Sequence, residues 1–222
     1  MKRLREYLFA DRCGDALEWR IIMYITCLDL EGVLVPEIWI AFAKASGIPE
    51  LEKTTRDEPD YDKLMNYRLG ILKEHGLGLK EIQETIAKID PMPGAKEFLD
   101  ELRKIGQVII ISDTFSQFAT PLMEKLGWPT IFCNSLEVAE NGEITGYKMR
   151  CEKSKYTTVK ALQSIGYDTI ASGDSYNDLG MINASKAGFL FKSPEQIKAD
   201  NPQLEAFETY DELLAAIKKA MV

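Results

Sequence analysis

Carboxylates and hydroxyls gather at three places in the chain, each directly after a short run of apolar residues. Such runs are typical of buried strands, and in open α/β sheets ligands bind where the carboxyl ends of the strands meet. The polar residues at these places are Asp29 and Glu31, Ser112 to Thr114, and Asp174 to Asp178. We therefore expect carboxylates from distant parts of the sequence to converge at one edge of a sheet.

Converging carboxylates repel one another unless a cation lies between them. Carboxylate oxygens together with a substrate phosphate are the ligands that Mg²⁺ prefers, and a carboxylate beside such a metal can attack phosphorus. Lys153 and Lys155 lie at the start of the helix that precedes the strand before Asp174. One of these two lysines is expected to neutralise phosphate charge. A helix is also expected to begin after Ser112 and to present free backbone N–H groups to an anion.

The pattern around these residues predicts an α/β fold. Short apolar runs alternate with amphipathic stretches of about ten residues, which favours a Rossmann-like parallel sheet with helices on both faces. The expected strands are 24–30, 107–111, 130–133, 169–172 and 188–191, and the expected helices are 95–104, 115–126, 156–165, 176–184 and 210–221. Asn141-Gly142 between 136–139 and 143–147 predicts a hairpin.

Two regions fall outside this alternation. Residues 36–91 contain three helical patterns (37–46, 61–75 and 79–89) and no convincing strand, so we expect a helical insert after the first strand of a core domain that spans 23–35 and 92–222. Residues 1–22 read as an N-terminal extension. Either Met23 is the native start, or the extension is an amphipathic helix packed on the surface; the sequence leaves both open.

The composition excludes several classes of protein. The net charge is −8, so the basic surface of a nucleic-acid-binding protein is missing. Apolar runs are much shorter than the roughly 18 residues of a membrane span. The four cysteines form no CxxC pair, which favours reduced thiols in a cytoplasmic protein over a zinc site or disulfides.

Together these motifs resemble a known family. Asp29-x-Glu31-Gly32, Ser112, Lys155 and the segment 173–178 (Gly-Asp-Ser-Tyr-Asn-Asp) match, in order and spacing, the four motifs of the haloacid dehalogenase-like phosphatases. The helical insert resembles the cap of the phosphoserine phosphatase branch. The segments 27–42 and 54–62 are most similar to its bifunctional phosphoserine phosphatase/homoserine phosphotransferase subgroup.

The resemblance implies a role for each core residue. Asp29 matches the nucleophile, Glu31 the general acid/base that also offers its carbonyl to Mg²⁺, and Asp174 a second Mg²⁺ ligand. The residues that match phosphate-binding positions are Ser112, Asp113, Lys155 and Asn177, and Asp178 supports the metal site without touching the ion.

In the cap, Glu37 and Arg68 resemble the residues that bind the amino group and the carboxylate of phosphoserine, and Tyr61 resembles an aromatic that closes the pocket. The implied partners are L-phosphoserine and homoserine, with a monomer or homodimer expected.

Two positions depart from the ordinary phosphoserine phosphatases. Glu31 replaces an Asp, as it does in the bifunctional subgroup, and its extra methylene could favour an alcohol over water as acceptor. Glu37 follows Asp29 by eight residues, one fewer than usual, which weakens its assignment. The core motifs also leave open a phosphatase for another small phosphomonoester and a non-catalytic module that binds a phosphorylated ligand.

Overall fold

A computed structural model describes residues 8–13, 16–21, 23–54, 57–58 and 60–222 of the chain. Its centre is a seven-stranded sheet in the order β6-β5-β4-β3-β7-β8-β9, in which only β6 is antiparallel to its neighbour. The strands are β3 (Met23–Leu28), β4 (Gln107–Phe115), β5 (Thr130–Val138), β6 (Ile144–Lys148), β7 (Tyr167–Gly173), β8 (Ala187–Phe191) and β9 (Glu205–Phe207). The predicted α/β fold is confirmed.

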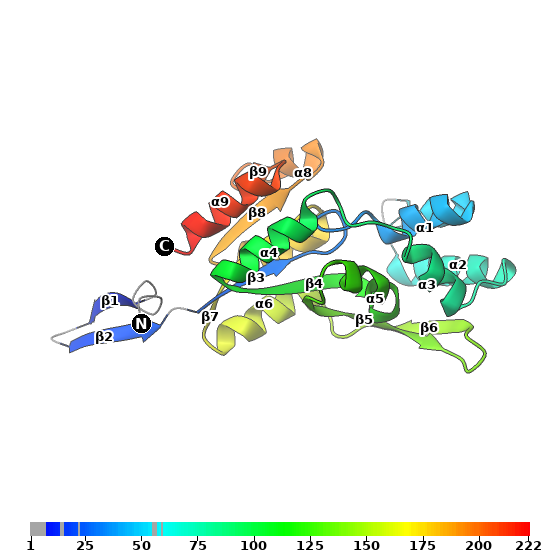
Figure 1. Cartoon of the computed structure of the whole chain (residues 1–222), viewed down its shortest axis with the longest axis horizontal. Coiled ribbons are helices and arrows are strands. Elements are labelled where there is room, and N and C mark those ends of the chain that lie inside the picture. Colours follow the sequence, from blue (N-terminus) through cyan, green and yellow to red (C-terminus); the bar gives the residue numbers. More distant parts are fainter. Residues whose placement is uncertain (1–7, 14–15, 22, 55–56, 59) are drawn as a thin grey trace.

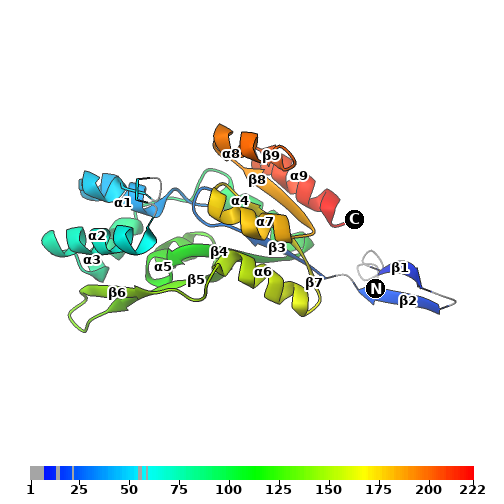
Figure 2. The same cartoon turned by 180° about the vertical axis from the view of Figure 1, so that it is seen from behind.

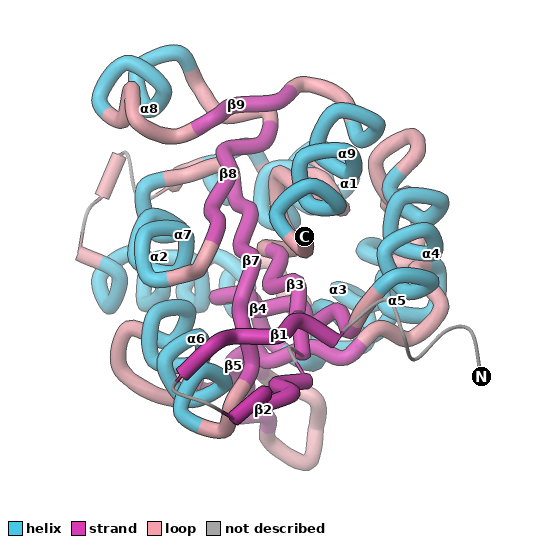
Figure 3. The backbone as a smooth tube through the Cα atoms, turned by 90° about the vertical axis from the view of Figure 1, so that its left-hand side faces the viewer, coloured by secondary structure: helices cyan, strands magenta, loops and turns pink. Residues whose placement is uncertain are grey.

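Helices cover both faces of this sheet (Figure 3). Side chains alternate between the faces along each strand: in β3, Ile25 and Cys27 join one hydrophobic cluster, while Tyr24 and Leu28 join the other. The helices of the core are α4 (Ala95–Ile105), α5 (Ser116–Lys125), α6 (Ser154–Ser164), α7 (Leu179–Ala184), α8 (Glu195–Asp200) and α9 (Tyr210–Ala220), with the 3₁₀ turn η2 (Tyr176–Asp178) before α7.

The second predicted strand ends later than expected, which bears on the site. The helix predicted at 115–126 forms as α5, which begins at Ser116. The strand predicted to end at residue 111 continues as β4 to Phe115, with its pairing to β5 shifted after Ile111, so no helix N-terminus lies directly at Ser112. Thr114 N–H instead donates to Ser112 Oγ at 3.2 Å, and Ser112 is buried within the strand.

The insert between β3 and α4 consists of helices and lies at one end of the molecule (Figure 1). Its elements are α1 (Ile38–Ser46), the 3₁₀ helix η1 (Pro49–Glu52), α2 (Tyr61–Glu74) and α3 (Leu79–Ile86). Strands β5 and β6 form the predicted hairpin, and its tip contacts the insert. Leu79 N–H donates to the Gly142 carbonyl at 2.9 Å, and Lys73 pairs with Glu143 at 2.9 Å.

The N-terminal region is a hairpin of its own. Strands β1 (Leu8–Cys13) and β2 (Ala16–Ile21) pair antiparallel and lie apart from the central sheet (Figures 1 and 2). The alternative of a surface helix is therefore wrong for these residues, because the backbone of Leu8–Cys13 pairs with that of Ala16–Ile21. Residues 1–7, 14–15 and 22 lie outside the described part. Within the described residues, no helix is long and apolar enough to cross a membrane.

Candidate active site

The register of the parallel strands brings Asp29, Ser112 and Asp174 to one edge of the sheet. Leu28 of β3 pairs with Ile110 of β4 on one side and with Ser172 of β7 on the other. Asp29, Ser112 and Asp174 follow these partners within one or two positions. The parallel sheet therefore places the Ser112 hydroxyl on one side of Asp29 and the Asp174 carboxylate on the other, and the Asp29 N–H donates to the Ser172 carbonyl at 3.0 Å.

Lys155 is the cation of this edge. It lies in the first turn of α6, and its Nζ is 2.9 Å from Asp29 Oδ2 and 2.5 Å from Asp178 Oδ1, with all three side chains buried. Burial alone would lower the pKa of Lys155, but Asp178 and Asp29 outweigh it and the net pKa is raised. Of the two lysines left open by the sequence, Lys153 is exposed and takes a left-handed backbone conformation with φ +46°.

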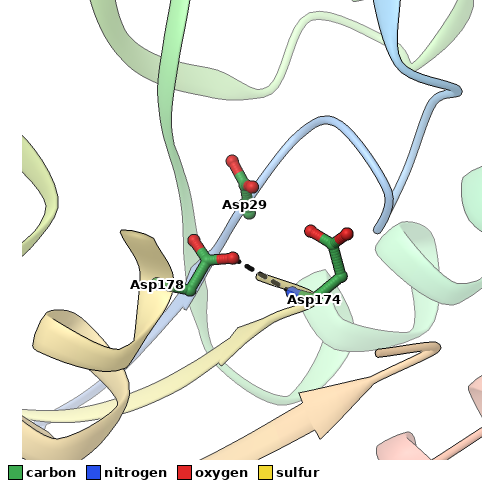
Figure 4. A group of neighbouring side chains, drawn as sticks. All are labelled: Asp29, Asp174 and Asp178. Atoms are coloured by element: carbon green, nitrogen blue, oxygen red, sulfur yellow. Dashed lines mark hydrogen bonds between the residues drawn. The ribbon is translucent and has the colours of Figure 1, made fainter. Parts of the chain in front are cut away.

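Asp178 holds the loop together around this lysine. Its second oxygen, Oδ2, accepts from the backbone N–H of Asp174 at 3.0 Å (Figure 4). The same oxygen accepts from the backbone N–H of Ser175 at 3.0 Å and from the Ser175 hydroxyl at 3.1 Å. Both oxygens of Asp178 are therefore engaged by protein donors. Its side chain is fully buried, so it orients Lys155 and the Asp174 loop from behind.

Gly32 allows the loop after Asp29 to pass close to Asp174. Its φ of +75° is a conformation that other residues rarely adopt, and a Cβ built there would lie only 2.4 Å from Asp174 Cγ. The turn is closed by Leu34 and Val35, whose N–H groups donate to the Leu30 carbonyl. Glycine is thus required twice over, by backbone angle and by the adjacent carboxylate.

The carboxylates of Asp29, Asp174 and Asp178 have oxygen atoms within 4.8 Å of one another. Burial and then the charge of Asp178 raise the pKa of Asp29, and the same two causes raise the pKa of Asp174 to about 7. This mutual repulsion marks a place where a cation would be stabilised. Oxygen-only donors fit a hard divalent ion such as Mg²⁺ rather than a softer metal.

Glu31 lies between the core and the insert. Its Oε2 accepts from Ile38 N–H, at the first turn of α1, at 2.9 Å. Burial and then Glu37 raise its pKa to about 7, while Lys155 from the core and Arg68 from α2 act in the opposite direction. The Glu31 carboxylate thus interacts electrostatically with a cation of the core and with a cation of the insert, so it lies where these two regions meet.

Asp113 connects the remaining polar residues at this edge of the sheet, which include Ser112 and Asn177. The Asp113 carboxylate accepts from Ser154 Oγ and from Asn177 Nδ2, both at 2.9 Å. It thus ties β4 to the start of α6 and to the loop that carries Asp174. Ser112 is buried beside it, whereas Asn177 is exposed and turned to Asp113.

The insert contributes a buried arginine. Arg68 on α2 is 6% exposed, donates from Nη2 to the Lys53 carbonyl at 2.8 Å, and has its guanidinium carbon 4.5 Å from the centre of the Trp39 ring. Among the described residues, no acceptor faces its Nε. A buried donor without a partner is costly, and here it is available to an anion.

Tyr61 and Glu37 flank this arginine differently. The Tyr61 ring is half-buried and packs edge-on against Tyr147 of β6, with ring centres 5.8 Å apart. Burial and then Asp113 raise its pKa, so the ring faces the core edge. Glu37 is exposed at the N-terminus of α1, and its charge acts on Glu31, Asp174 and Arg68.

A family model for haloacid dehalogenase-like hydrolases matches residues 26–186, which contain all of these side chains. The chain belongs to this family. It is 52% identical over 198 residues to phosphoserine phosphatase ThrH of Pseudomonas aeruginosa, an alignment that covers 89% of this chain and 97% of that protein. It is 50% identical over 196 residues to a phosphoserine phosphatase of Pseudomonas syringae, covering 88% and 83%.

Solved structures of family members share the fold. A substrate-bound phosphoserine phosphatase complex superposes with a TM-score of 0.72 at 23% identity, covering 87% of this chain and 98% of that one. A phospho-aspartyl intermediate analogue of phosphoserine phosphatase gives 0.70 at 23% identity, covering 88% and 99%. At this identity the likeness concerns the fold of this haloacid dehalogenase-like chain.

Sequence reasoning missed the residues that orient the site. Ser154, beside Lys155, holds Asp113, and Asn134 donates from Nδ2 to the Asp113 carbonyl at 2.9 Å. Trp39 lies in an apolar stretch of α1 that is typical of ordinary packing. A serine at a helix start was a usable signal for Ser154, but nothing in the pattern of α1 distinguishes Trp39 from its neighbours.

Proposed function

We propose that this chain is a Mg²⁺-dependent phosphoserine phosphatase that works through an aspartyl-phosphate on Asp29 and also transfers phosphate to homoserine. The observation that carries the proposal is the pair of cations around Glu31: Lys155 lies against Asp29, and Arg68 offers an unpartnered Nε from the insert. A ligand that places its phosphate against Lys155 and its carboxylate against Arg68 would be a short phosphorylated amino acid.

The metal site consists of Asp29, Asp174 and the backbone carbonyl of Glu31. Asp178 stays outside the coordination sphere because its oxygens are engaged by Lys155 and the loop. When bound, Mg²⁺ would neutralise phosphate charge and bring the phosphoryl group up to Asp29. Burial and then the charge of Asp178 raise the pKa values of Asp29 and Asp174, and a bound cation would stabilise the ionised form of both carboxylates.

The first chemical step is attack of an Asp29 oxygen on phosphorus. The bond from phosphorus to the serine oxygen breaks, and the leaving oxygen takes the proton of Glu31. Lys155 and the Ser112 hydroxyl bind the phosphate oxygens as charge spreads over them. The positioning contacts of Asp113 with Ser154 and Asn177 keep these groups at one edge.

The second step returns the phosphate to an acceptor. Glu31, now ionised, takes a proton from water, whose oxygen attacks phosphorus while the bond to Asp29 breaks. With homoserine, the hydroxyl oxygen attacks instead and O-phosphohomoserine leaves. The additional methylene of Glu31, compared with Asp, is proposed to favour this larger acceptor.

Residues 36–91 act as the cap in this proposal. Arg68 binds the substrate carboxylate and Glu37 its ammonium group, while Tyr61 closes the pocket from the hairpin side. Closure about the connections near Pro36 and Pro91 excludes bulk water during the first step. The unpaired thiols of Cys27 and Cys133 support a reducing, cytoplasmic setting.

The test is phosphate release from O-phospho-L-serine with Mg²⁺, with and without homoserine. The proposal expects O-phosphohomoserine to appear while free phosphate falls. L-2-aminobutyrate, which lacks the hydroxyl, is the matched control and leaves phosphate release unchanged. Phosphate release that homoserine does not alter would leave a phosphatase without the transfer activity. No turnover of phosphoserine would contradict the proposal as a whole.

A further inference from the structure

Arg68 has few contacts that fix the plane of its guanidinium. Nη2 has the Lys53 carbonyl at 2.8 Å, and Nη1 has only the Met65 sulfur at 3.9 Å, a weak acceptor. Burial lowers the pKa of Arg68 to about 10. A long side chain with one good hydrogen bond would lose much conformational freedom on binding a carboxylate, so whatever orients it beforehand determines its affinity.

Trp39 provides that orientation. The centre of its ring lies 4.5 Å from the guanidinium carbon, within the range of a cation–π contact, and Trp39 is only 9% exposed. Two further aromatic rings hold it in place: Phe42 in the same helix with centres 6.4 Å apart, and Phe118 of α5 with centres 5.3 Å apart. Because α5 belongs to the core, the ring fixes the cap arginine against the body of the enzyme.

The same helix turn also reaches the core carboxylate. Ile38, the residue before Trp39, donates its N–H to Glu31. The first turn of α1 therefore contacts both the group proposed to move the proton and the group proposed to bind the substrate carboxylate.

We propose that Trp39 is a positioning residue that sets the preference for a substrate carboxylate by holding Arg68 in its binding orientation. This inference rests on the proposed function, since it requires Arg68 to bind that carboxylate. Trp39 itself does not touch the substrate. Its removal is expected to act on KM for carboxylate-bearing substrates and to leave substrates without a carboxylate unaffected.

The experiment compares O-phospho-L-serine with O-phosphoethanolamine, which has the same amine and phosphate but no carboxylate. Trp39→Leu should lower kcat/KM for phosphoserine about tenfold through KM and change that for phosphoethanolamine less than about twofold. Trp39→Phe keeps an aromatic face and should retain most of the preference. Trp128→Leu, the same change at a 64% exposed tryptophan, is the matched control and should alter neither substrate.

A double-mutant cycle with Arg68→Ala separates this role from simple packing. In the Arg68→Ala background, Trp39→Leu should have no further effect on phosphoserine. Equal losses on both substrates, or a Trp39 effect that persists without Arg68, would overturn the inference and leave the proposed function intact. If the parent enzyme does not prefer phosphoserine, or Arg68→Ala leaves that preference unchanged, carboxylate binding by Arg68 is wrong and the Trp39 inference is overturned with it.

Discussion

The core edge and the cap hold their charged residues in opposite ways. At the edge, the ammonium of Lys155 lies between the buried carboxylates of Asp29 and Asp178 and pairs with both. In the cap, Arg68 is just as buried but keeps one donor unpartnered and leans on an aromatic ring. In the proposed mechanism, the core edge stabilises negative charge that develops on the phosphate during the reaction. Arg68 instead binds a negative charge that the substrate carboxylate already carries.

In the proposed mechanism the phosphate contacts Asp29 after β3, Ser112 in β4 and Lys155 at the start of α6, so the core edge is expected to be indifferent to the rest of the substrate. In the same proposal the cap contacts only the amino acid portion. Changes in the core should therefore affect all substrates equally, and changes in the cap should alter the preference among them.

Asp29→Asn should lower turnover of every phosphomonoester by at least about a thousandfold, because an amide cannot form the aspartyl-phosphate. The measurement is steady-state phosphate release with Mg²⁺, for phosphoserine and phosphoethanolamine in parallel. Asp168→Asn, far from the site in an ion pair with Lys186, is the matched control. Substantial Mg²⁺-dependent turnover by Asp29→Asn would rule out the proposed nucleophile.

Lys155→Met should reduce kcat about a hundredfold on both substrates and also destabilise the fold. Removing the lysine leaves Asp29 and Asp178 buried without their counter-ion, which costs about 3 kcal/mol in the free energy of unfolding. Urea denaturation without Mg²⁺ measures the second effect. Lys153→Met, at the exposed neighbouring lysine, should change neither quantity; similar losses in the two variants would contradict the assignment.

Arg68→Ala should raise KM for phosphoserine about ten- to a hundredfold, since a buried hydrogen-bonded ion pair is lost. Phosphoethanolamine should be affected little, because it offers nothing for the arginine to bind. Lys63→Ala, an exposed residue of the same helix, serves as the control. A parallel loss on both substrates would mean that Arg68 supports the cap without reading the carboxylate.

Glu31→Asp should raise the ratio of hydrolysis to transfer by several fold, because the proposal expects the shorter acid to hold the attacking water better than Glu31 does. Phosphate and O-phosphohomoserine are measured together in one reaction. An unchanged ratio would remove Glu31 as the cause of acceptor choice.

Tyr147→Phe should have the smallest effect. The hydroxyl of Tyr147 on the hairpin donates to Asp62 of the cap, and its loss costs about 0.5 kcal/mol at this exposed contact. Burial and then this bond raise the pKa of Tyr147 to about 12. The stabilisation is therefore present below the usual tyrosine pKa near 10 and is lost as pH rises towards 12. A tyrosinate absorbance difference between wild type and variant that appears near pH 10 would contradict the contact.

The sequence predicts the sheet and its strand-end carboxylates because apolar runs followed by Asp and Ser are local patterns. It misses α8 and β9 because these segments, such as the three residues Glu205–Phe207, are too short to show a periodicity. It ends the second strand too early, at residue 111, because the extension of β4 to Phe115 depends on pairing with β5. Arg68 and Trp39 become partners only through the packing of two cap helices, which no local pattern in the sequence predicts. The cap residues could therefore be proposed only from the resemblance to a family, whereas the core residues follow from apolar runs that end in polar residues.

The central claim is that the core performs phosphoryl transfer and the cap selects the amino acid. Its most direct test is the ratio of kcat/KM for phosphoserine to that for phosphoethanolamine in wild type, Lys155→Met and Arg68→Ala. The account predicts a ratio well above one in wild type, unchanged in Lys155→Met and collapsed in Arg68→Ala. A ratio that collapses in Lys155→Met, or survives in Arg68→Ala, would contradict it.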